Sequence, residues 1–468
     1  MNKILIALTI AGLTISCGKE TQEVVTQEVQ PAPVVSTPKN IIMIVGDGMG
    51  PTYTTAYRYF KDDPSTPRVE NTVFDRHLVG MSSTYPDTHH NYVTDSAAAA
   101  TALSSAIKTY NGAVAVDMDK QNVETVLERA KSLGMKTGVV VTSQINHATP
   151  ASYLSHNDYR YNYNAIADSY IDNGIQADLY LGGGWKFFIR EDRNLVEEFE
   201  DNGFNYIDSY QLLDSVSTDK PLLGLFGDKG LPWALDDTNK HRLSAMTKTA
   251  TKHLENEDGY FLLIEGSQID WAGHSNDIAS AMGEMDDLAK TLEYLETYVK
   301  EHPDTLVVIT ADHSTGGVTL GVDGVFQWDP KVLRTMKQSP NSIANLLEKV
   351  DITTEYANSL FNFELTDEEI SKLITVKNDT ATAIKIAEVT GIEDARSGKE
   401  YDPFTVNNEL YKAIKEVINA RTFTGWTSSG HTAADVPVFA MGNNKALFNG
   451  YQDNTDIAKK IFTLLDNK

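Results

Sequence analysis

The run Asn40-Ile41-Ile42-Met43-Ile44-Val45 decides the fold class of this 468-residue chain, because it is apolar at almost every position. A strand with one face in water alternates apolar and polar residues, whereas a strand that is buried on both faces does not. Similar runs occur at residues 138–141, 260–264, 306–309 and 436–440, and helical patterns occupy residues 123–133 and 277–300. This alternation predicts an α/β fold: a doubly wound, mostly parallel central sheet with helices on both faces.

Polar residues follow these apolar runs at the points where the strands should end. They are Asp47, His147, Thr149, Glu265, Asp312 and His313. In open α/β sheets, sites form at the carboxyl ends of the strands. We therefore expect distant segments to deliver carboxylates and imidazoles to one edge of the sheet.

The stretch Thr94-Asp95-Ser96-Ala97-Ala98 has the composition of a helix start. The side chain of Asp95 or of Ser96 can cap this helix by accepting from a free backbone N–H. A hydroxyl at a helix N-terminus lies in positive potential, where an anion such as phosphate is favoured. The motif alone most often marks an ordinary capped helix, so the rest of the chain must decide whether Ser96 is a cap or a nucleophile.

Several short motifs carry possible metal or phosphate ligands. Asp270 and His274 are four residues apart, which places both on one helical face, and their side chains suit zinc. Asp312-His313 and Gly430-His431-Thr432 add further candidate ligands, and Arg160 could clamp a phosphate through two N–H donors. The glycines around Asp47 do not form a dinucleotide fingerprint, because Pro51 stands where its last glycine belongs.

The N-terminal sequence is typical of an export signal. Residues 1–16 predict a signal peptide, and the sole cysteine, Cys17, follows a lipobox-like stretch, so residues 17–38 are expected to form a lipidated, flexible tether. A plain signal peptide with an incidental cysteine is the alternative. We expect an exported periplasmic or cell-envelope lipoprotein, held at the membrane only through its lipid.

The net charge of −25 disfavours nucleic-acid binding.

The remaining residues, 39–468, are expected to form one catalytic domain with an inserted helical subdomain at about 325–424. Thr366 to Glu369 form a capping box that opens a helix. Leu410, Ile414 and Val417 continue an apolar stripe at helical spacing. Packing or a dimer contact is the expected role of the insertion, ahead of a lid or specificity role.

Taken together and in order, these motifs resemble the alkaline phosphatase family of metal-dependent phosphomonoesterases. The resemblance covers residues 40–462 apart from the long insertion. It rests on the stretches Gly46–Gly50, Thr94–Ala98, Lys108–Gly112, Leu181–Gly184, Glu265–His274, Thr310–His313 and Gly430–Ala433.

The resemblance implies a site for two zinc ions and one magnesium ion. Asp270, His274 and His431 match the ligands of the first zinc. Asp47, Asp312 and His313 match those of the second zinc, which the nucleophile's oxygen also coordinates. Asp47 would bridge to the magnesium site, completed by Thr149 and Glu265.

The resemblance also implies a phosphoserine mechanism. Ser96 matches the nucleophile and Arg160 the phosphate clamp, with Asp95 orienting Arg160. His147 stands where the best-known bacterial enzyme has aspartate, which leaves the identity of the third metal open. Trp271 stands where that enzyme has lysine, so phosphate should be held less tightly.

Three other functions are weighed against a monoesterase. A sulfatase of the same superfamily needs a Cys/Ser-x-Pro-x-Arg motif, and Ala97-Ala98-Ala99 after Ser96 breaks it. Phosphodiesterases commonly lack the third metal site and the arginine, so Thr149, Glu265 and Arg160 favour monoesters. A non-catalytic surface-binding lipoprotein is the third alternative, although no expected ligand is missing. Relatives are often homodimers, which makes a homodimer possible.

Overall fold

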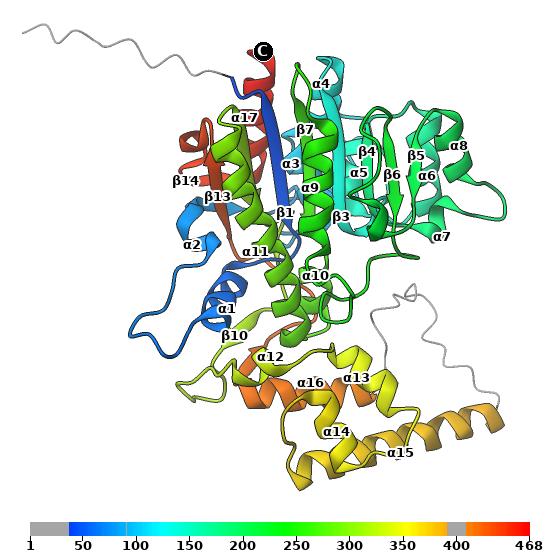
Figure 1. Cartoon of the computed structure of the whole chain (residues 1–468), viewed down its shortest axis with the longest axis vertical. Helices are drawn as coiled ribbons and strands as arrows, with labels where there is room; N and C mark the ends of the chain where they lie inside the picture. Colours follow the sequence, from blue (N-terminus) through cyan, green and yellow to red (C-terminus); the bar gives the residue numbers. More distant parts are fainter. Residues whose placement is uncertain (1–36, 90, 391–408) are drawn as a thin grey trace, which may run out of the picture. The chain divides into compact units, whose positions relative to one another are not determined.

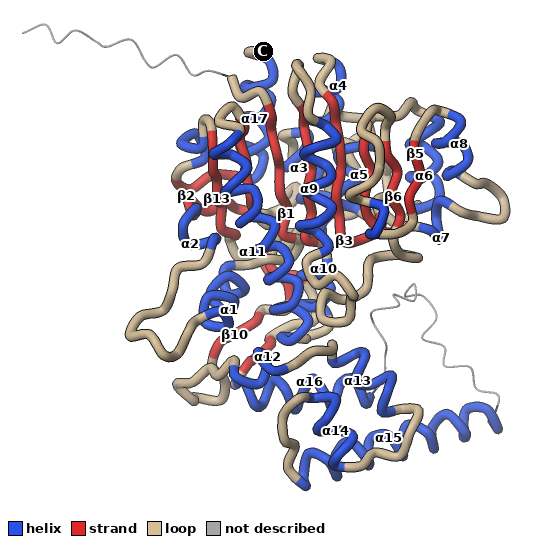
Figure 2. Tube along the Cα trace, viewed as in Figure 1, coloured by secondary structure: helices blue, strands red, loops and turns tan. Residues whose placement is uncertain are grey.

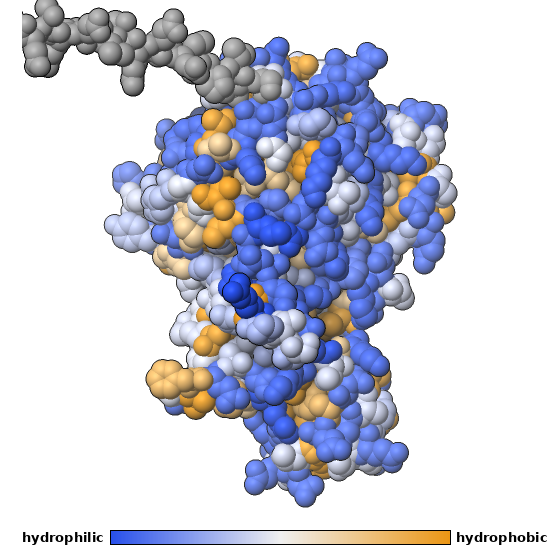
Figure 3. Space-filling view, turned by 60° about the vertical axis from the view of Figure 1, so that its left-hand side comes forward, coloured by the Kyte–Doolittle hydropathy of each residue, from blue (hydrophilic) through white to orange (hydrophobic). Residues whose placement is uncertain are grey.

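The computed structural model describes residues 37–89, 91–390 and 409–468. The predicted signal peptide, Cys17 and almost all of the tether lie outside these residues, as does part of the predicted insertion. Within the described ranges, no helix is both long and apolar enough to cross a membrane. The face of the molecule in Figure 3 is largely hydrophilic, with apolar residues in small separate groups.

A ten-stranded sheet forms the centre of the fold, in the order β14-β2-β13-β8-β1-β7-β3-β4-β6-β5 (Figure 2). β1 (Asn40–Gly46) lies between β8 (Thr305–Thr310) and β7 (Tyr260–Gly266) and is parallel to both. The other strands of this sheet are β2 (Leu78–Ser83), β3 (Lys136–Gln144), β4 (Leu179–Gly183), β5 (Asn205–Ile207), β6 (Leu222–Leu225), β13 (Val436–Gly442) and β14 (Gly450–Asp453). Two small sheets pair β9 (Ser314–Thr315) with β12 (His431–Thr432), and β10 (Val318–Leu320) with β11 (Thr424–Trp426).

Helices cover both faces of this sheet (Figure 1). Outside the segment between β10 and β11 they are α1 (Pro51–Lys61), α2 (Val73–His77), α3 (Ser96–Ser105), α4 (Val126–Ser132), α5 (Ala148–Leu154), α6 (Tyr163–Asp172), α7 (Trp185–Phe188), α8 (Leu195–Asp201), α9 (Arg242–Leu254), α10 (Gln268–His274), α11 (Ile278–Glu301) and α17 (Asn454–Asp466). Between β10 and β11 lie α12 (Lys331–Thr335), α13 (Pro340–Leu347), α14 (Thr354–Phe361), α15 (Asp367–Thr390) and α16 (Glu409–Thr422). The predicted fold class is confirmed.

Successive side chains of β1 enter two different cores, which explains why the strand is apolar throughout. Ile42 and Ile44 belong to the core under α1, α9 and α11. Ile41, Met43 and Val45 belong to the core under α3, α4, α5 and α17. Because neither face of the strand meets water, no polar alternation remains in the sequence.

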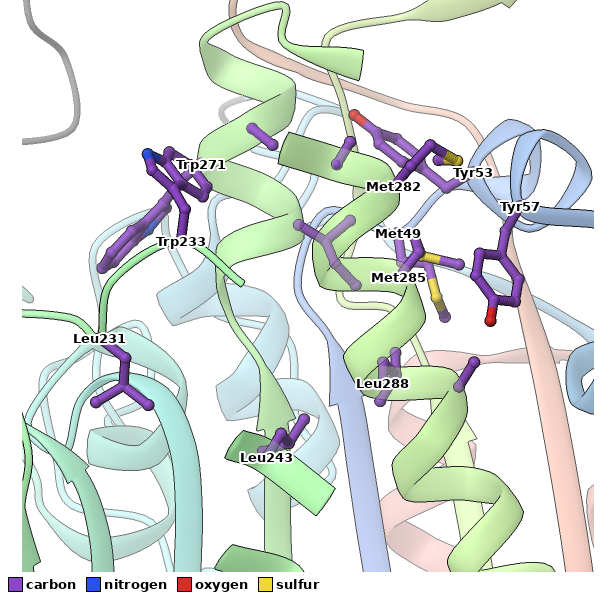
Figure 4. Close-up of a cluster of buried hydrophobic side chains, with 14 of the residues drawn as sticks. Met49, Tyr53, Tyr57, Leu231, Trp233, Leu243, Trp271, Met282, Met285 and Leu288 are labelled. Carbon is purple, nitrogen blue, oxygen red and sulfur yellow. The ribbon is translucent and has the colours of Figure 1, made fainter. Parts of the chain in front are cut away.

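Part of the first core packs directly behind the segment that follows β1. Figure 4 shows Met49 and Tyr53 facing Met282 and Met285 of α11, all of them buried. Trp271 of α10 and Trp233 belong to the same cluster (Figure 4). The turn after β1 and the helix α10 are therefore held by one continuous apolar cluster.

β13 departs from the parallel arrangement, because it runs antiparallel to both β8 and β2. The sequence placed residues 436–440 among the buried strands without fixing their direction. The chain reaches β13 from β12, which pairs with β9 just beyond the carboxyl end of β8. A strand that starts at that edge must run back toward the opposite one, so it is antiparallel.

The predicted capping box and apolar stripe are both present in the helices between β10 and β11. Glu369 N–H donates to Thr366 Oγ1 at 3.2 Å, and Thr366 N–H donates to Glu369 Oε2 at 2.8 Å. Leu410 and Ile414 of the stripe are buried. α16 also contacts the loop after α10: Asn419 Nδ2 donates to the Asn276 carbonyl at 3.1 Å.

A fully buried arginine joins α9 to α10 and α11. Arg242 Nη1 donates to Asp287 Oδ2 at 2.8 Å, and Nη2 donates to Glu284 Oε2 at 2.9 Å. Nη2 also donates to Gln268 Oε1 at 2.5 Å, at the first residue of α10. Burial raises the pKa of Glu284 to about 7, which reflects the cost of keeping these acids out of water.

Replacing Arg242 with methionine should strongly destabilise the fold, because it leaves buried carboxylates without a partner. We expect a loss of about 3–5 kcal/mol in the free energy of unfolding. Arg76→Met is the matched control, since Arg76 pairs with Glu296 while 38% of its side chain is exposed, and should cost at most about 1 kcal/mol. Urea unfolding followed by tryptophan fluorescence measures both, and equal losses would contradict the argument.

Candidate active site

The carboxyl ends of four neighbouring strands meet at one edge of the sheet and carry the predicted acids and imidazoles. Asp47 follows β1, Glu265 is near the end of β7, and Asp312 and His313 follow β8. His147 precedes α5, which follows β3. All of these side chains are buried, as is that of Thr149 within α5.

A glycine lets the segments at this edge approach closely. Gly48 has φ +71°, and a Cβ there would lie 2.7 Å from Thr315 Oγ1 and 2.8 Å from Asp270 Cα. Its N–H donates to Asp312 Oδ1 at 3.0 Å. Any larger residue would push apart the chain around Asp47, α10 and β9, so the tight turn predicted around Asp47 has a steric reason.

Ser96 is the first residue of α3, but Asp95 is the residue that caps the helix. Asp95 Oδ1 accepts from the Ala98 N–H at 3.0 Å. The Ser96 hydroxyl is therefore not used as a cap, and its Oγ lies 3.2 Å from His313 Nε2. The sequence left the choice between the two caps open; the structure leaves a buried hydroxyl facing the imidazole of a candidate ligand.

Arg160 lies beside this serine's helix. Its Nη1 donates to Asp95 Oδ2 at 3.0 Å, and its Nη2 lies 3.5 Å from His147 Nε2. Its Nε is buried, and no hydrogen-bond partner for it occurs in the described part of the chain. Asp95 thus binds both the N-terminus of α3 and the guanidinium of Arg160.

The candidate ligands fall into groups whose donor atoms all lie within 4.8 Å of one another. These groups are Asp270, His313 and His431; Asp47, Asp312 and His313; and Asp47, His147 and Glu265. His274 joins the first group, because its Nε2 lies 3.0 Å from His431 Nε2 and 3.3 Å from Asp270 Oδ2. The structure brings together all of the predicted acidic and imidazole ligands.

Backbone carbonyls fix the tautomers of two of these histidines. His431 Nδ1 donates to the Thr94 carbonyl at 2.8 Å, and His274 Nδ1 donates to the Ser429 carbonyl at 2.6 Å. A carbonyl can only accept, so each Nδ1 carries hydrogen and each Nε2 is free to bind a cation. Burial lowers the pKa of His274, but Asp270 raises it to about 9, so a proton occupies this space when no metal does.

Thr315 links the ligand groups to each other. Its Oγ1 donates to Asp270 Oδ1 at 2.5 Å and lies 3.2 Å from His313 Nδ1. Because the hydroxyl hydrogen is given to the carboxylate, the imidazole must supply the other hydrogen, which leaves His313 Nε2 free toward Ser96. Thr315 is fully buried, and its carbonyl accepts from Tyr53 Oη at 2.8 Å.

The carboxylates of the site repel one another. Burial, followed by the charges of Asp312 and Asp270, raises the pKa of Asp47 well above its usual value. Burial also raises the pKa of Glu265 to about 7 and that of Asp312 to about 7. Several buried oxygens of these acids have no hydrogen-bond partner among the described residues: both of Asp47, Glu265 Oε1 and Asp312 Oδ2. Unpartnered buried carboxylate oxygens facing imidazole nitrogens are a donor set that fits metal cations.

His147 neighbours both Arg160 and Trp271. Burial lowers the pKa of His147 to about 3, so its ring is neutral and can act as a metal ligand. The sequence placed His147 near the third metal site, and the structure puts its imidazole in a group with Asp47 and Glu265. The Trp271 ring lies edge-on to the His147 ring, with 5.9 Å between their centroids.

Sequence reasoning missed two polar residues of this site, Thr315 and Ser143. Ser143 Oγ donates to Glu265 Oε2 at 3.3 Å. Both are small hydroxyl residues close in sequence to a predicted ligand. Neither type is distinctive, and only the folded chain reveals which hydroxyl points back into the site.

Comparisons with known proteins agree with this geometry. The family model for alkaline phosphatase matches residues 38–467. Alkaline phosphatase 3 of Bacillus subtilis is 45% identical over 433 residues, which cover 91% of this chain and 89% of that protein. The crystal structure of a cold-active alkaline phosphatase from Shewanella sp. is 46% identical with a TM-score of 0.82, covering 91% of this chain and 99% of that one. A mutant of TAB5 alkaline phosphatase with Mg bound in its M3 site is 26% identical with a TM-score of 0.66, covering 92% of this chain and 98% of that one. The chain belongs to the alkaline phosphatase family.

Proposed function

We propose that this protein hydrolyses phosphate monoesters to an alcohol and inorganic phosphate, with Ser96 as the nucleophile and a phosphoserine intermediate. One observation carries the proposal: the buried Ser96 hydroxyl lies 3.2 Å from His313 Nε2, among carboxylates that need a cation. Family membership supports the same reaction class. Arg160, with an unpartnered buried Nε, offers positive charge to the oxygens of a monoester dianion.

In the first half-reaction, Ser96 Oγ attacks the phosphorus in line, the bond between phosphorus and the ester oxygen breaks, and the alcohol leaves with a proton. In the second, a water oxygen attacks the same phosphorus, and the bond to Ser96 Oγ breaks as that oxygen regains a proton. Arg160 balances charge on the equatorial oxygens throughout. Bound metal ions would supply Lewis-acid charge that lowers the pKa of the hydroxyl and stabilises the leaving oxygen.

The proposed metals are two zinc ions and one magnesium ion. Asp270, His274 and His431 would hold the first zinc. Asp47, Asp312 and His313 would hold the second. The third site would use Asp47, Thr149 and Glu265, with His147 as a further ligand. The donor chemistry supports this division, because imidazole nitrogen suits zinc, whereas a site rich in carboxylate and hydroxyl oxygen suits magnesium. A mutant of TAB5 alkaline phosphatase has Mg bound in its M3 site, which supports magnesium as one of the ions proposed here.

We further propose that the enzyme is exported and anchored through lipid on Cys17, in the periplasm or cell envelope, as a possible homodimer. Residues 325–424 would form a packing insertion of the catalytic domain. Its α16 already supports the loop that follows His274, through Asn419 and through Tyr411 Oη, which donates to Asp277 Oδ2 at 3.0 Å.

Hydrolysis of p-nitrophenyl phosphate by residues 39–468 tests the proposed reaction directly. We expect metal-dependent activity that a chelator removes and that Ser96→Ala nearly abolishes, because no other group replaces the nucleophile. Ser132→Ala, an exposed serine at the end of α4, is the control and should retain activity. Faster hydrolysis of bis-p-nitrophenyl phosphate would favour a diesterase, and no activity with either ester would favour a binding lipoprotein.

Substitutions at Thr315 test whether its hydroxyl holds the metal ligands. Thr315→Val keeps the shape but removes the bonds to Asp270 and His313, so metal affinity should fall by about 10–100-fold. Thr315→Ser keeps the hydroxyl and should retain metal as wild type does. Metal content measured by mass spectrometry after dialysis against graded chelator gives the result, and tight retention by the valine variant would refute the role.

Trp271→Lys tests how tightly the site holds inorganic phosphate. A lysine in place of Trp271, beside His147, would add a cation to this part of the site, so inorganic phosphate should inhibit the variant several-fold more strongly than wild type. Trp271→Met removes the indole ring without adding charge, so it separates the effect of losing the ring from the effect of gaining a cation. Inhibition constants measured with p-nitrophenyl phosphate decide the matter, and equal inhibition of wild type and the lysine variant would rule the idea out.

A further inference from the structure

The Asn111-Gly112 pair closes the sequence motif at residues 108–112, and it has no part in the chemistry proposed above. Asn111 is exposed, yet both ends of its side-chain amide bond the backbone just ahead of the nucleophile. Nδ2 donates to the Val93 carbonyl at 3.0 Å, and Oδ1 accepts from the Asp95 N–H at 3.0 Å. A backbone N–H only donates and a carbonyl only accepts, so the orientation of this amide is fixed.

The three residues that Asn111 brackets, 93–95, hold three separate parts of the site. The Thr94 carbonyl accepts from His431 Nδ1 at 2.8 Å and sets the tautomer of that imidazole. Asp95 Oδ1 caps α3, whose first residue is Ser96. Asp95 Oδ2 accepts from Arg160 Nη1 at 3.0 Å. A shift of this segment therefore moves a candidate metal ligand, the nucleophile and the phosphate clamp together.

The neighbouring glycine holds the backbone of the clamp. Arg160 N–H donates to the Gly112 carbonyl at 2.9 Å, where Gly112 has φ +94°. The side chain of Asn111 thus binds residues 93–95, and the carbonyl of Gly112 binds the backbone of Arg160. These two segments must face each other across the phosphate. This left-handed backbone favours glycine, which allows the pair to turn sharply between its two partners.

We propose that Asn111 is a positioning residue of the active site, which sets the distance between Ser96, Arg160 and His431 through the backbone of residues 93–95. This inference rests on the proposed function, because it concerns the same reaction. Asn111 itself belongs to none of the candidate ligand groups. A misplacement of about 1 Å at a reacting centre can lower the rate about 100-fold. An exposed side chain without such a role would leave the rate unchanged.

The test compares Asn111→Ala with Asn256→Ala in the full-length, metal-loaded protein. Asn256 brackets a loop in the same way: its Nδ2 donates to the carbonyls of Leu254 at 2.7 Å and Gly259 at 2.9 Å, while its Oδ1 accepts from the Asp258 N–H at 2.7 Å. That loop precedes β7, at the sheet edge opposite the site. We expect Asn111→Ala to lower kcat for p-nitrophenyl phosphate about 10-fold or more, and Asn256→Ala to stay within about twofold of wild type.

A third variant and two further measurements complete the test. Asn111→Asp keeps the acceptor for the Asp95 N–H and loses the donor to Val93, so its kcat should lie between those of wild type and Asn111→Ala. The melting temperature of Asn111→Ala should fall no further than that of Asn256→Ala. The inhibition constant for inorganic phosphate should rise in Asn111→Ala, because Asp95 no longer holds Arg160 firmly.

Hydrogen–deuterium exchange of the peptide covering residues 93–98 separates this inference from the proposed reaction. Faster exchange in Asn111→Ala, but not in Asn256→Ala, supports the positioning role even if the wild-type protein hydrolyses no monoester, a result that would refute the proposed function alone. Unchanged exchange, a kcat within about twofold of wild type, or equal losses of kcat in both alanine variants would each overturn the inference.

Discussion

The repulsion among buried carboxylates at one sheet edge is the constraint on which the rest of the structure depends. Asp47, Glu265, Asp270 and Asp312 are all buried. Charged groups in such surroundings need cations or protons, and only a rigid frame keeps them together against their repulsion. The parallel strands β1, β7 and β8 provide this frame, because their carboxyl ends are fixed side by side by their pairing.

The frame is reinforced by hydrogen bonds that cross between distant segments. Carbonyls of Thr94 and Ser429 orient the imidazoles of His431 and His274, and Thr315 orients the imidazole of His313. Each imidazole therefore presents Nε2 to the centre of the site. Further out, Arg242 ties the start of α10 to α11, so the helix that carries Asp270 is anchored from behind. The side chains that could hold metal ions are thus oriented by hydrogen bonds within the protein itself.

Much of the fold could be predicted, because its central strands are buried on both faces and are therefore almost uniformly apolar. The direction of β13 could not be predicted, since a buried strand has the same composition in either orientation. The acids and imidazoles of the site followed from their places at strand ends and from the family resemblance. The choice of Asp95 over Ser96 as the cap, the bond from Thr315 to Asp270 and the bracket made by Asn111 depend on contacts between segments that no local pattern encodes.

The pairing of β12 with β9 has a consequence for the order in which the molecule is made. It brings His431 against residues that follow β8, while Asp47 directly follows the first strand, β1. A ribosome releases these segments from first to last, so the candidate ligand group of Asp270, His313 and His431 stays incomplete until residue 431 has been synthesised. A nascent or truncated chain would carry the acids without the last imidazole. Completion of that group is consequently separate in time from the synthesis of the early strands.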